Sequence, residues 1–226
     1  MPAGAPKAAQ QAGAERTPGL RERNKLDKER RIREAARELF IAKGFDDATT
    51  REIAVRAGVG IGTVFTYADN KRDLLFLIAN DELASLARIG MANIRDDSSF
   101  LQNVLHFFSP YYEFYEKQPD LSRMILREMT FYDAGRQVTQ FRQTRVEIVD
   151  ALAQITKLAM EQGALRTKEE PKFIAWVMFA IFQVETRQWL RGAAILSVAE
   201  GLARLRRAIT LLLNGLDATS AALKMR

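Results

Sequence analysis

The sequence contains no cysteine, one histidine and only six prolines in 226 residues. Without cysteine there are no disulfides, thiolate zinc sites, iron–sulfur clusters or cysteine nucleophiles, and one histidine is too few for a typical metal cage. We therefore expect no metal, no cofactor and no enzymatic activity. The longest nearly continuous apolar stretch, residues 173–182, is too short to cross a bilayer, and no apolar leader opens the chain. These absences predict a cytoplasmic protein that does not enter a membrane.

What remains is a helical pattern. After residue 20 the only prolines are Pro110, Pro119 and Pro171, and no long Val/Ile/Thr run alternates with a period of two. Apolar residues three and four positions apart predict helices over about 27–43, 49–57, 61–67, 71–95, 100–116, 119–131, 135–162, 170–191 and 197–214. The predicted fold class is all-α.

Three helices near the N-terminus have clear end signals. Gly44 supplies a left-handed residue after the first helix, and Thr49 with Glu52 forms the capping box of the second. The turn Gly58-Val59-Gly60 leads into the third. Two short helices joined by a tight turn and packed on a longer helix form a helix-turn-helix, whose second helix can enter the DNA major groove.

The net charge of +6 agrees with a polyanionic partner for this part of the chain. Residues 1–75 hold 15 Lys and Arg against 11 Asp and Glu, a surplus of +4, whereas the rest holds 19 against 17. So small a surplus also serves solubility alone.

This segment resembles the TetR family of bacterial transcription regulators. The resemblance rests on Ile32-x-x-Ala35-Ala36-x-x-Leu39-Phe40, Gly44-Phe45, Thr49-Thr50-x-x-Ile53-Ala54, Ala57-Gly58-Val59, Gly62-Thr63-Val64-Phe65 and Lys71-x-x-Leu74. It implies a helix-turn-helix domain over 25–71 and a larger helical effector-binding and dimerisation domain over 72–216. The composition of the ends predicts a disordered arm over 1–24 and a flexible tail over 217–226.

The resemblance also implies which residues contact DNA. Residues at the starts of the second and fourth helices, and hydroxyl groups on the third, are expected to contact phosphates. The exposed face of the third helix is expected to contact the bases. Gly60 stands where the family usually has a capping serine, and Phe65 lacks a hydroxyl that Tyr67 supplies instead. The candidate DNA-binding residues are Thr49, Thr50, Arg51, Gly60, Ile61, Gly62, Thr63, Phe65, Thr66, Tyr67 and Lys71.

Each of these assignments has a rival. Thr49 and Thr50 are helix caps first, and Ile61 is also suited to packing. The basic stretch Arg21, Arg23, Lys25, Lys28, Arg30 and Arg31 suits an arm along DNA, yet acidic residues interleave with it as on a solvated helix face. Gly58, Gly60 and Gly62 follow no strand and precede no G-K-[ST] ending, which disfavours a nucleotide-binding loop.

The predicted helices 170–191 and 197–214 are candidates for a homodimer interface. The first is apolar nearly all round and the second carries a leucine and isoleucine stripe. A helix-turn-helix that reads a palindromic double-stranded DNA operator needs two copies at a fixed separation. The alternative is that both helices are buried within one subunit.

Residues 100–141 hold ten of the twenty aromatic residues, and Pro110 should bend its helix or break the helix's hydrogen bonding and so help to open a cavity. Aromatic side chains line small-molecule sites, although for any single aromatic residue core packing is the better interpretation. The candidate effector-binding residues are His106, Phe107, Tyr111, Met124, Arg127, Phe131, Phe179 and Gln183.

The sequence thus predicts a homodimeric, sequence-specific DNA-binding transcriptional regulator. We expect a repressor that a small hydrophobic or aromatic effector releases from its operator. Two alternatives stay open: a helical enzyme or small-molecule carrier without DNA affinity, and a sequence-independent DNA-coating protein. No nucleophile–base pair supports the enzyme, and the modest charge disfavours coating.

Overall fold

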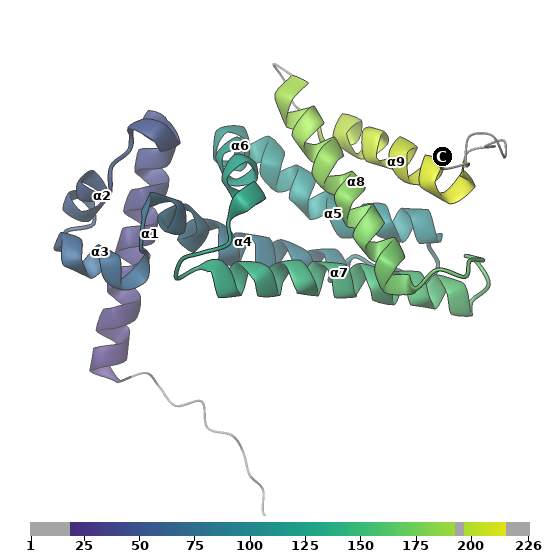
Figure 1. The fold of residues 1–226 in the computed structure, drawn as a ribbon, viewed down its shortest axis with the longest axis horizontal. Helices are drawn as coiled ribbons and strands as arrows, with labels where there is room; N and C mark the ends of the chain where they lie inside the picture. The colour runs from purple at the N-terminus through teal and green to yellow at the C-terminus, as the bar shows by residue number, and fades with distance from the viewer. Residues whose placement is uncertain (1–18, 193–196, 216–226) are drawn as a thin grey trace, which may run out of the picture.

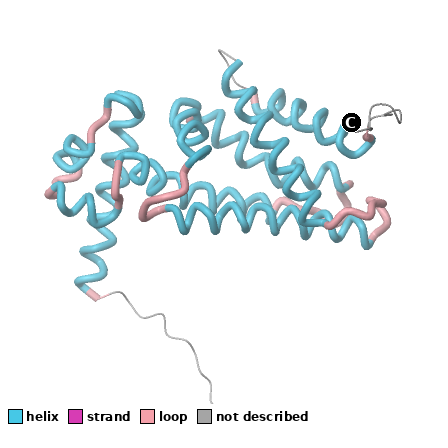
Figure 2. The backbone as a smooth tube through the Cα atoms, viewed as in Figure 1, coloured by secondary structure: helices cyan, strands magenta, loops and turns pink. Residues whose placement is uncertain are grey.

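The structure is a computed structural model that describes residues 19–192 and 197–215, and every regular element in these ranges is a helix. Figure 2 shows only helices and loops in the described part. The elements are α1 (Leu20–Asp47), α2 (Thr50–Arg56), α3 (Ile61–Tyr67), α4 (Lys71–Ala92), α5 (Phe100–Lys117), α6 (Pro119–Glu128), the 3₁₀ helix η1 (Met129–Phe131), α7 (Val138–Glu161), α8 (Pro171–Gly192) and α9 (Val198–Asn214). The all-α fold class is confirmed.

The helices α1, α2 and α3 form a small N-terminal unit at one end of the molecule (Figure 1). The apolar face of α1 is buried, with Ile32 and Phe40 fully covered, and it shares one core with Ile53 of α2 and Val64 of α3. Burial of such side chains contributes about 1.5–3 kcal/mol each. Packing of α1, more than local propensity, therefore holds the two seven-residue helices in place.

Local end signals give these helices their bounds, as the sequence predicts. Gly44 has φ 82° and interrupts the helical conformation of α1, and glycine adopts this left-handed region without steric cost. The Thr49 side chain accepts from the Glu52 N–H at 3.2 Å, and the Glu52 carboxylate accepts from the Thr49 N–H at 3.0 Å. The predicted capping box is thus confirmed.

A single long helix, α4, joins the two parts of the molecule (Figure 1). It begins beside the N-terminal unit and continues against α5 and α7, which α8 and α9 cover in turn. Near its end α4 approaches α5 so closely that a Cβ built on Gly90 would overlap the Phe107 carbonyl oxygen. The larger core is strongly aromatic, and Phe108 stacks on Phe182 with ring centroids 4.1 Å apart.

Two expectations about the chain's ends need comment. The first helix begins at Leu20, so residues 20–24 are helical and not part of a disordered arm. Ion pairs between successive turns, such as Arg31 with Asp27 at 3.1 Å and Arg33 with Glu29 at 2.8 Å, support this polar stretch of helix. The rest of the predicted arm, residues 1–18, and the predicted tail at 217–226 lie outside the described residues.

The helix predicted over residues 100–116 is continuous in the structure, where α5 runs from Phe100 to Lys117 with Pro110 inside it. Buried aromatic residues flank the proline on both sides, among them Phe107 and Tyr111, and their packing offsets one missing backbone hydrogen bond. The neighbouring rings contact one another, so the proline does not open a cavity between them.

Candidate nucleic-acid interface

One face of α3 is exposed and takes no part in the fold. Ile61 and Phe65 are 41% and 43% exposed, and Gly62 and Thr66 lie on the same face at helical spacing. The opposite face carries Val64 and Tyr67, which are buried, while Thr63 is half-buried between the two. Two exposed apolar side chains on a seven-residue helix indicate a surface that meets a partner.

The glycines of this face are open to close approach. A Cβ on Gly60 or Gly62 would meet no heavy atom within 4 Å, and neither residue has a positive φ. The packing of this chain therefore does not demand glycine at either position. Small residues here leave the backbone N–H groups at the start of α3 accessible, and such groups favour an anionic partner.

Tyr67 has a hydrogen-bond partner for its hydroxyl within the fold. Its ring is 9% exposed, and its hydroxyl donates a hydrogen bond to the Lys25 carbonyl at 3.0 Å, whereas the sequence suggested a phosphate contact. Burial raises the pKa of this hydroxyl. Tyr67 therefore fastens the first turns of α1 to the end of α3. Sequence spacing gives no sign of this pairing, because 42 residues separate the two partners.

Three candidate DNA-binding residues, Thr49, Thr50 and Arg51, lie at the start of α2. They differ in whether their polar groups already have partners within the fold. The Thr49 hydroxyl is engaged in the cap, where it also donates to the Glu52 carboxylate at 2.9 Å. Thr50 is half-buried, and Arg51 is exposed and forms no ion pair with a described residue. The structure thus favours the capping role for Thr49 and leaves Arg51 as the cation available at this helix start.

Lys71, at the start of α4, contacts the end of α1. Its ammonium donates to the Asp46 carbonyl at 2.8 Å and lies 4.8 Å from the centre of the Phe45 ring. Asn70 caps the same helix by accepting from the Asp73 N–H at 2.9 Å. Two of the three ammonium hydrogens remain for other acceptors.

The basic residues of α1 divide into two groups. Arg30 pairs with Asp27 and Glu34, and Arg31 pairs with Asp27 and donates to the Ala57 carbonyl, as on a solvated helix face. Lys25 and Lys28 are exposed, and their ammonium groups form no ion pair with a described residue. The hydrogen bond from the Tyr67 hydroxyl to the Lys25 carbonyl places this part of α1 beside the end of α3.

The predicted effector residues do not form one cluster. Phe107, Tyr111 and Phe179 are enclosed in the aromatic core, and Met124 is 9% exposed. His106 is half-buried, and its buried Nδ1 has no hydrogen-bond partner.

Gln183, Arg127 and Phe131 lie nearer the surface. The Gln183 amide oxygen accepts from Arg187 at 2.8 Å. Arg127 and Phe131 line the same surface pocket between α6 and α8. Arg187, which the sequence did not single out, lines this pocket as well.

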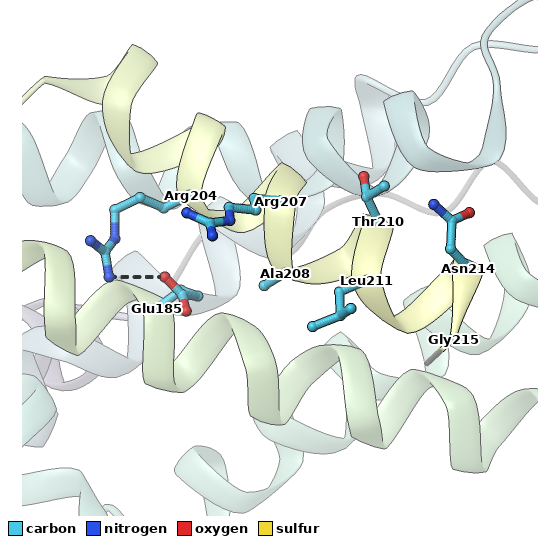
Figure 3. Close-up of a pocket in the computed structure, with 8 residues that line it drawn as sticks. All are labelled: Glu185, Arg204, Arg207, Ala208, Thr210, Leu211, Asn214 and Gly215. Atoms are coloured by element: carbon cyan, nitrogen blue, oxygen red, sulfur yellow. Dashed lines mark ion pairs between the residues drawn. The ribbon is translucent and has the colours of Figure 1, made fainter. Parts of the chain in front are cut away.

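The predicted dimer helices, α8 and α9, leave an apolar face uncovered. Phe173, Val184 and Leu211 are between 53% and 58% exposed, and Trp176 is 42% exposed. Figure 3 shows a hollow between the two helices, in which Arg204 of α9 reaches the Glu185 carboxylate of α8. Leu211 points into the same hollow. Monomeric proteins seldom expose so much aromatic and aliphatic surface in one place.

Two further properties concern the described residues as a whole. None of their helices is both long enough and apolar enough to span a bilayer. They also contain no cluster of three or more His, Cys, Asp or Glu side chains arranged to hold a metal ion.

Comparison with known proteins gives consistent matches. Residues 32–78 match the family model described as bacterial regulatory proteins, tetR family. A curated relative, the uncharacterized HTH-type transcriptional regulator YvkB of Bacillus subtilis, is 25% identical over 172 residues, which cover 76% of this chain and 88% of that protein.

Solved structures share the fold over most of their length. Thermus thermophilus FadR, a TetR-family transcriptional repressor in complex with lauroyl-CoA, superposes with a TM-score of 0.66 at 25% identity, covering 85% of this chain and 96% of that one. Bacillus subtilis FadR in complex with stearoyl-CoA superposes with a TM-score of 0.65 at 17% identity, covering 83% of this chain and 98% of that one. The motif matches, the helix order and these likenesses agree: residues 32–78 match the TetR family model, and the chain as a whole is similar to TetR-family transcriptional regulators.

Proposed function

We propose that the chain is a homodimeric, sequence-specific DNA-binding regulator that represses transcription and leaves its operator when a small apolar molecule binds the larger domain. In this proposal residues 25–71 form the DNA-binding domain and residues 72–216 the effector-binding and dimerisation domain. The observation that carries it is the exposed face of α3, with Ile61 and Phe65 about two-fifths exposed and Gly62 open to close approach.

The DNA contacts follow from the geometry of this face. Ile61, Gly62 and Thr66 would meet base edges, where a thymine methyl group suits an aliphatic side chain. Arg51 and Lys71 would lie on phosphates at either side of the groove. Thr50, Gly60, Thr63 and Phe65 stay candidates as well, whereas Thr49 and Tyr67 act through the fold, by capping α2 and by fastening α1 to α3.

A binding assay tests this proposal. Fluorescence anisotropy with the upstream region of the chain's own gene and with random duplex, over a series of salt concentrations, should show tighter binding to the former. Ile61→Ala should weaken specific binding by about tenfold, as expected for loss of one base contact. Val146→Ala, at an equally exposed aliphatic position on α7, is the matched control and should bind as the parent does. Equal affinity for both duplexes would refute sequence-specific recognition.

Dimerisation would use the uncovered face of α8 and α9. Val184→Asp places a charge in this face and should shift sedimentation from dimer to monomer, because burying an unpaired carboxylate is costly. Ile89→Asp, at an exposed position on α4, should leave the dimer intact. Loss of the dimer in both variants, or in neither, would assign the interface elsewhere.

For the effector, the aromatic core favours an apolar molecule, and the acyl thioesters named for the two FadR structures are the first candidates. A catalytic role receives no support from the single histidine. The buried Nδ1 of His106 has no partner, so no carboxylate orients this ring as in a general base. Thermal-shift measurements with lauroyl-CoA and stearoyl-CoA, at concentrations well above the dissociation constant, should raise the melting temperature.

A further inference from the structure

A pocket of about 480 Å³ lies between α6, η1 and α8 and is lined by four arginines, Arg123, Arg127, Arg187 and Arg191. No Asp or Glu is among its lining residues. Its volume falls in the range of pockets that hold small ligands. Four guanidinium groups around one hollow repel one another unless anions lie between them.

Arg187 is the clearest uncompensated charge of the four. It is half-buried, and its hydrogen bonds go to neutral oxygens, the Gln183 carbonyl at 2.9 Å, the Gln183 amide at 2.8 Å and the Leu126 carbonyl at 3.5 Å. Burial and the nearby Arg145 lower its pKa. Arg145 is also half-buried, and it has two ring contacts but no ion pair with a described residue.

The other three arginines face the pocket with different partners. Arg191 is exposed and forms no ion pair with a described residue. Arg123 is held by Asp120 at 2.9 Å and by the Leu190 carbonyl at 3.0 Å. Arg127 is shared between Glu128 at 2.9 Å and Asp46. Carboxylates therefore hold two of the four guanidinium groups, and none holds the other two.

An apolar wall completes the pocket. Leu126 and Leu190 are buried at its base, and Phe131 is 82% exposed at its edge. Most of the surface of this aromatic side chain is in contact with solvent, so a ligand that covers it gains hydrophobic contact. The pocket therefore offers charge complementarity to an anion and apolar contact to the group attached to it.

We propose that this arginine pocket binds the anionic group, phosphate or carboxylate, of a ligand whose apolar part lies against Leu126, Leu190 and Phe131. Arg187 and Arg191 supply the guanidinium groups without an acidic partner, and guanidinium binds either anion in a bidentate way. The buried aromatic residues predicted as effector contacts, Phe107, Tyr111 and Phe179, are not among the residues that line this pocket.

The pocket is also connected to the DNA-binding unit, and this step of the inference depends on the proposed function. Both terminal nitrogens of Arg127 donate to the Asp46 carboxylate at 3.2 Å, and its guanidinium lies 5.4 Å from the Phe45 ring. Lys71 contacts the same two residues, through the Asp46 carbonyl and the Phe45 ring. An anion in the pocket competes with Asp46 for Arg127 and so loosens the end of α1 from α6. By linkage, DNA and the anion weaken each other's binding.

Calorimetric titration of the full chain with four probes tests the anion site. The probes are lauroyl-CoA, coenzyme A, laurate and inorganic pyrophosphate. Binding of coenzyme A and pyrophosphate assigns the anion as phosphate, and binding of laurate without them assigns it as carboxylate. Absence of heat with all four probes overturns the proposal.

Variants show whether the binding occurs in this pocket. Arg187→Gln and Arg191→Gln should each weaken the probe that binds by about tenfold or more, as expected for loss of a charged hydrogen bond. Arg88→Gln, which removes an exposed positive charge on α4, should leave binding unchanged. If Arg187→Gln fails to fold, as judged by circular dichroism, the probe affinity of Arg191→Gln, at an exposed position, is the test. Unchanged affinity in Arg191→Gln overturns the proposal.

Asp46→Asn tests the coupling. Removal of the competing carboxylate should tighten binding of the same probe several-fold and reduce the effect of the probe on DNA affinity, whereas a merely structural role for Asp46 would not tighten it. If Asp46→Asn tightens probe binding but the chain does not bind DNA, the proposed function is refuted and the proposed anion site is retained. DNA binding with unchanged probe affinity in Asp46→Asn refutes the coupling alone.

Discussion

The hydroxyl of Tyr132 donates a hydrogen bond to the fully buried carboxylate of Asp73, which lies in the first turn of α4. The same carboxylate accepts from the Arg136 N–H at 2.7 Å and the Asp69 N–H at 2.9 Å. Residues 132–137, between η1 and α7, are thereby held against the start of α4. This explains why α7 begins at Val138 and not at 135, as the sequence suggested.

Asp73→Asn should lower the free energy of unfolding by about 2–4 kcal/mol. The amide that replaces one carboxylate oxygen cannot accept from the backbone donors, which then lose their partners in a buried site. Tyr132→Phe removes one donor and should cost about 1–2 kcal/mol. Urea titration of both variants measures the difference. A larger loss in Tyr132→Phe than in Asp73→Asn would contradict the central role of the carboxylate.

Gly62→Ala and Gly90→Ala should affect the protein in opposite ways. A Cβ on Gly62 meets nothing, and alanine favours a helix by about 0.5–1 kcal/mol, so thermal stability should rise while DNA affinity falls. A Cβ on Gly90 meets the Phe107 carbonyl oxygen, and the variant should lose about 1–3 kcal/mol. Melting curves and anisotropy on the same samples test both. Unaltered DNA affinity in Gly62→Ala would argue against close approach at α3.

Tyr67→Phe should reduce stability by about 1 kcal/mol, because the Lys25 carbonyl loses its donor. The slope of log affinity for DNA against log salt should not change. A lower DNA affinity of the folded variant would instead show that the hydroxyl contacts a phosphate, as the family resemblance first implied, because an uncharged hydroxyl does not contribute to the salt slope.

Lys71→Ala should weaken binding to operator and random duplex alike and reduce the magnitude of the salt slope by about one unit. The reason is that a phosphate contact contributes charge without reading sequence. Lys117→Ala, at an exposed site on α5, serves as control for the lost charge. An unchanged slope in Lys71→Ala would restrict this lysine to its contacts with Asp46 and Phe45.

The capping box of α2 should respond to acid only at low pH. A hydrogen bond from Lys43 at 2.6 Å, together with the bonds from Thr49, lowers the pKa of Glu52 from 4.5 to about 2. A depressed folded pKa means that the stabilisation is complete above pH 4.5 and is lost as pH falls through about 2. Carboxyl NMR titration should show the pKa of Glu52 raised toward 4.5 in Lys43→Met and unaltered in Lys28→Met.

The sequence alone predicts the structural features that residues a few positions apart determine. Gly44 and the Thr49–Glu52 pair act within a few positions of themselves, so the bounds of α2 and α3 can be read from the chain. The role of Tyr67 and the pairing of Arg127 with Asp46 depend on residues 42 and 81 positions away, and no local pattern encodes them. The start of α1 was missed because Leu20 and Leu26 are exposed and leave no apolar face to recognise.

The approach of Gly90 to Phe107 has a mechanical consequence for α4. The two helices pack closely there, which opposes sliding of α4 along α5 and favours a tilt about this point. Lys71 lies about 28 Å further along the same helix at 1.5 Å per residue, so a tilt of about 5° moves it about 2.5 Å. A change too small to disturb the aromatic interior is thus large enough at the far end to break a hydrogen bond.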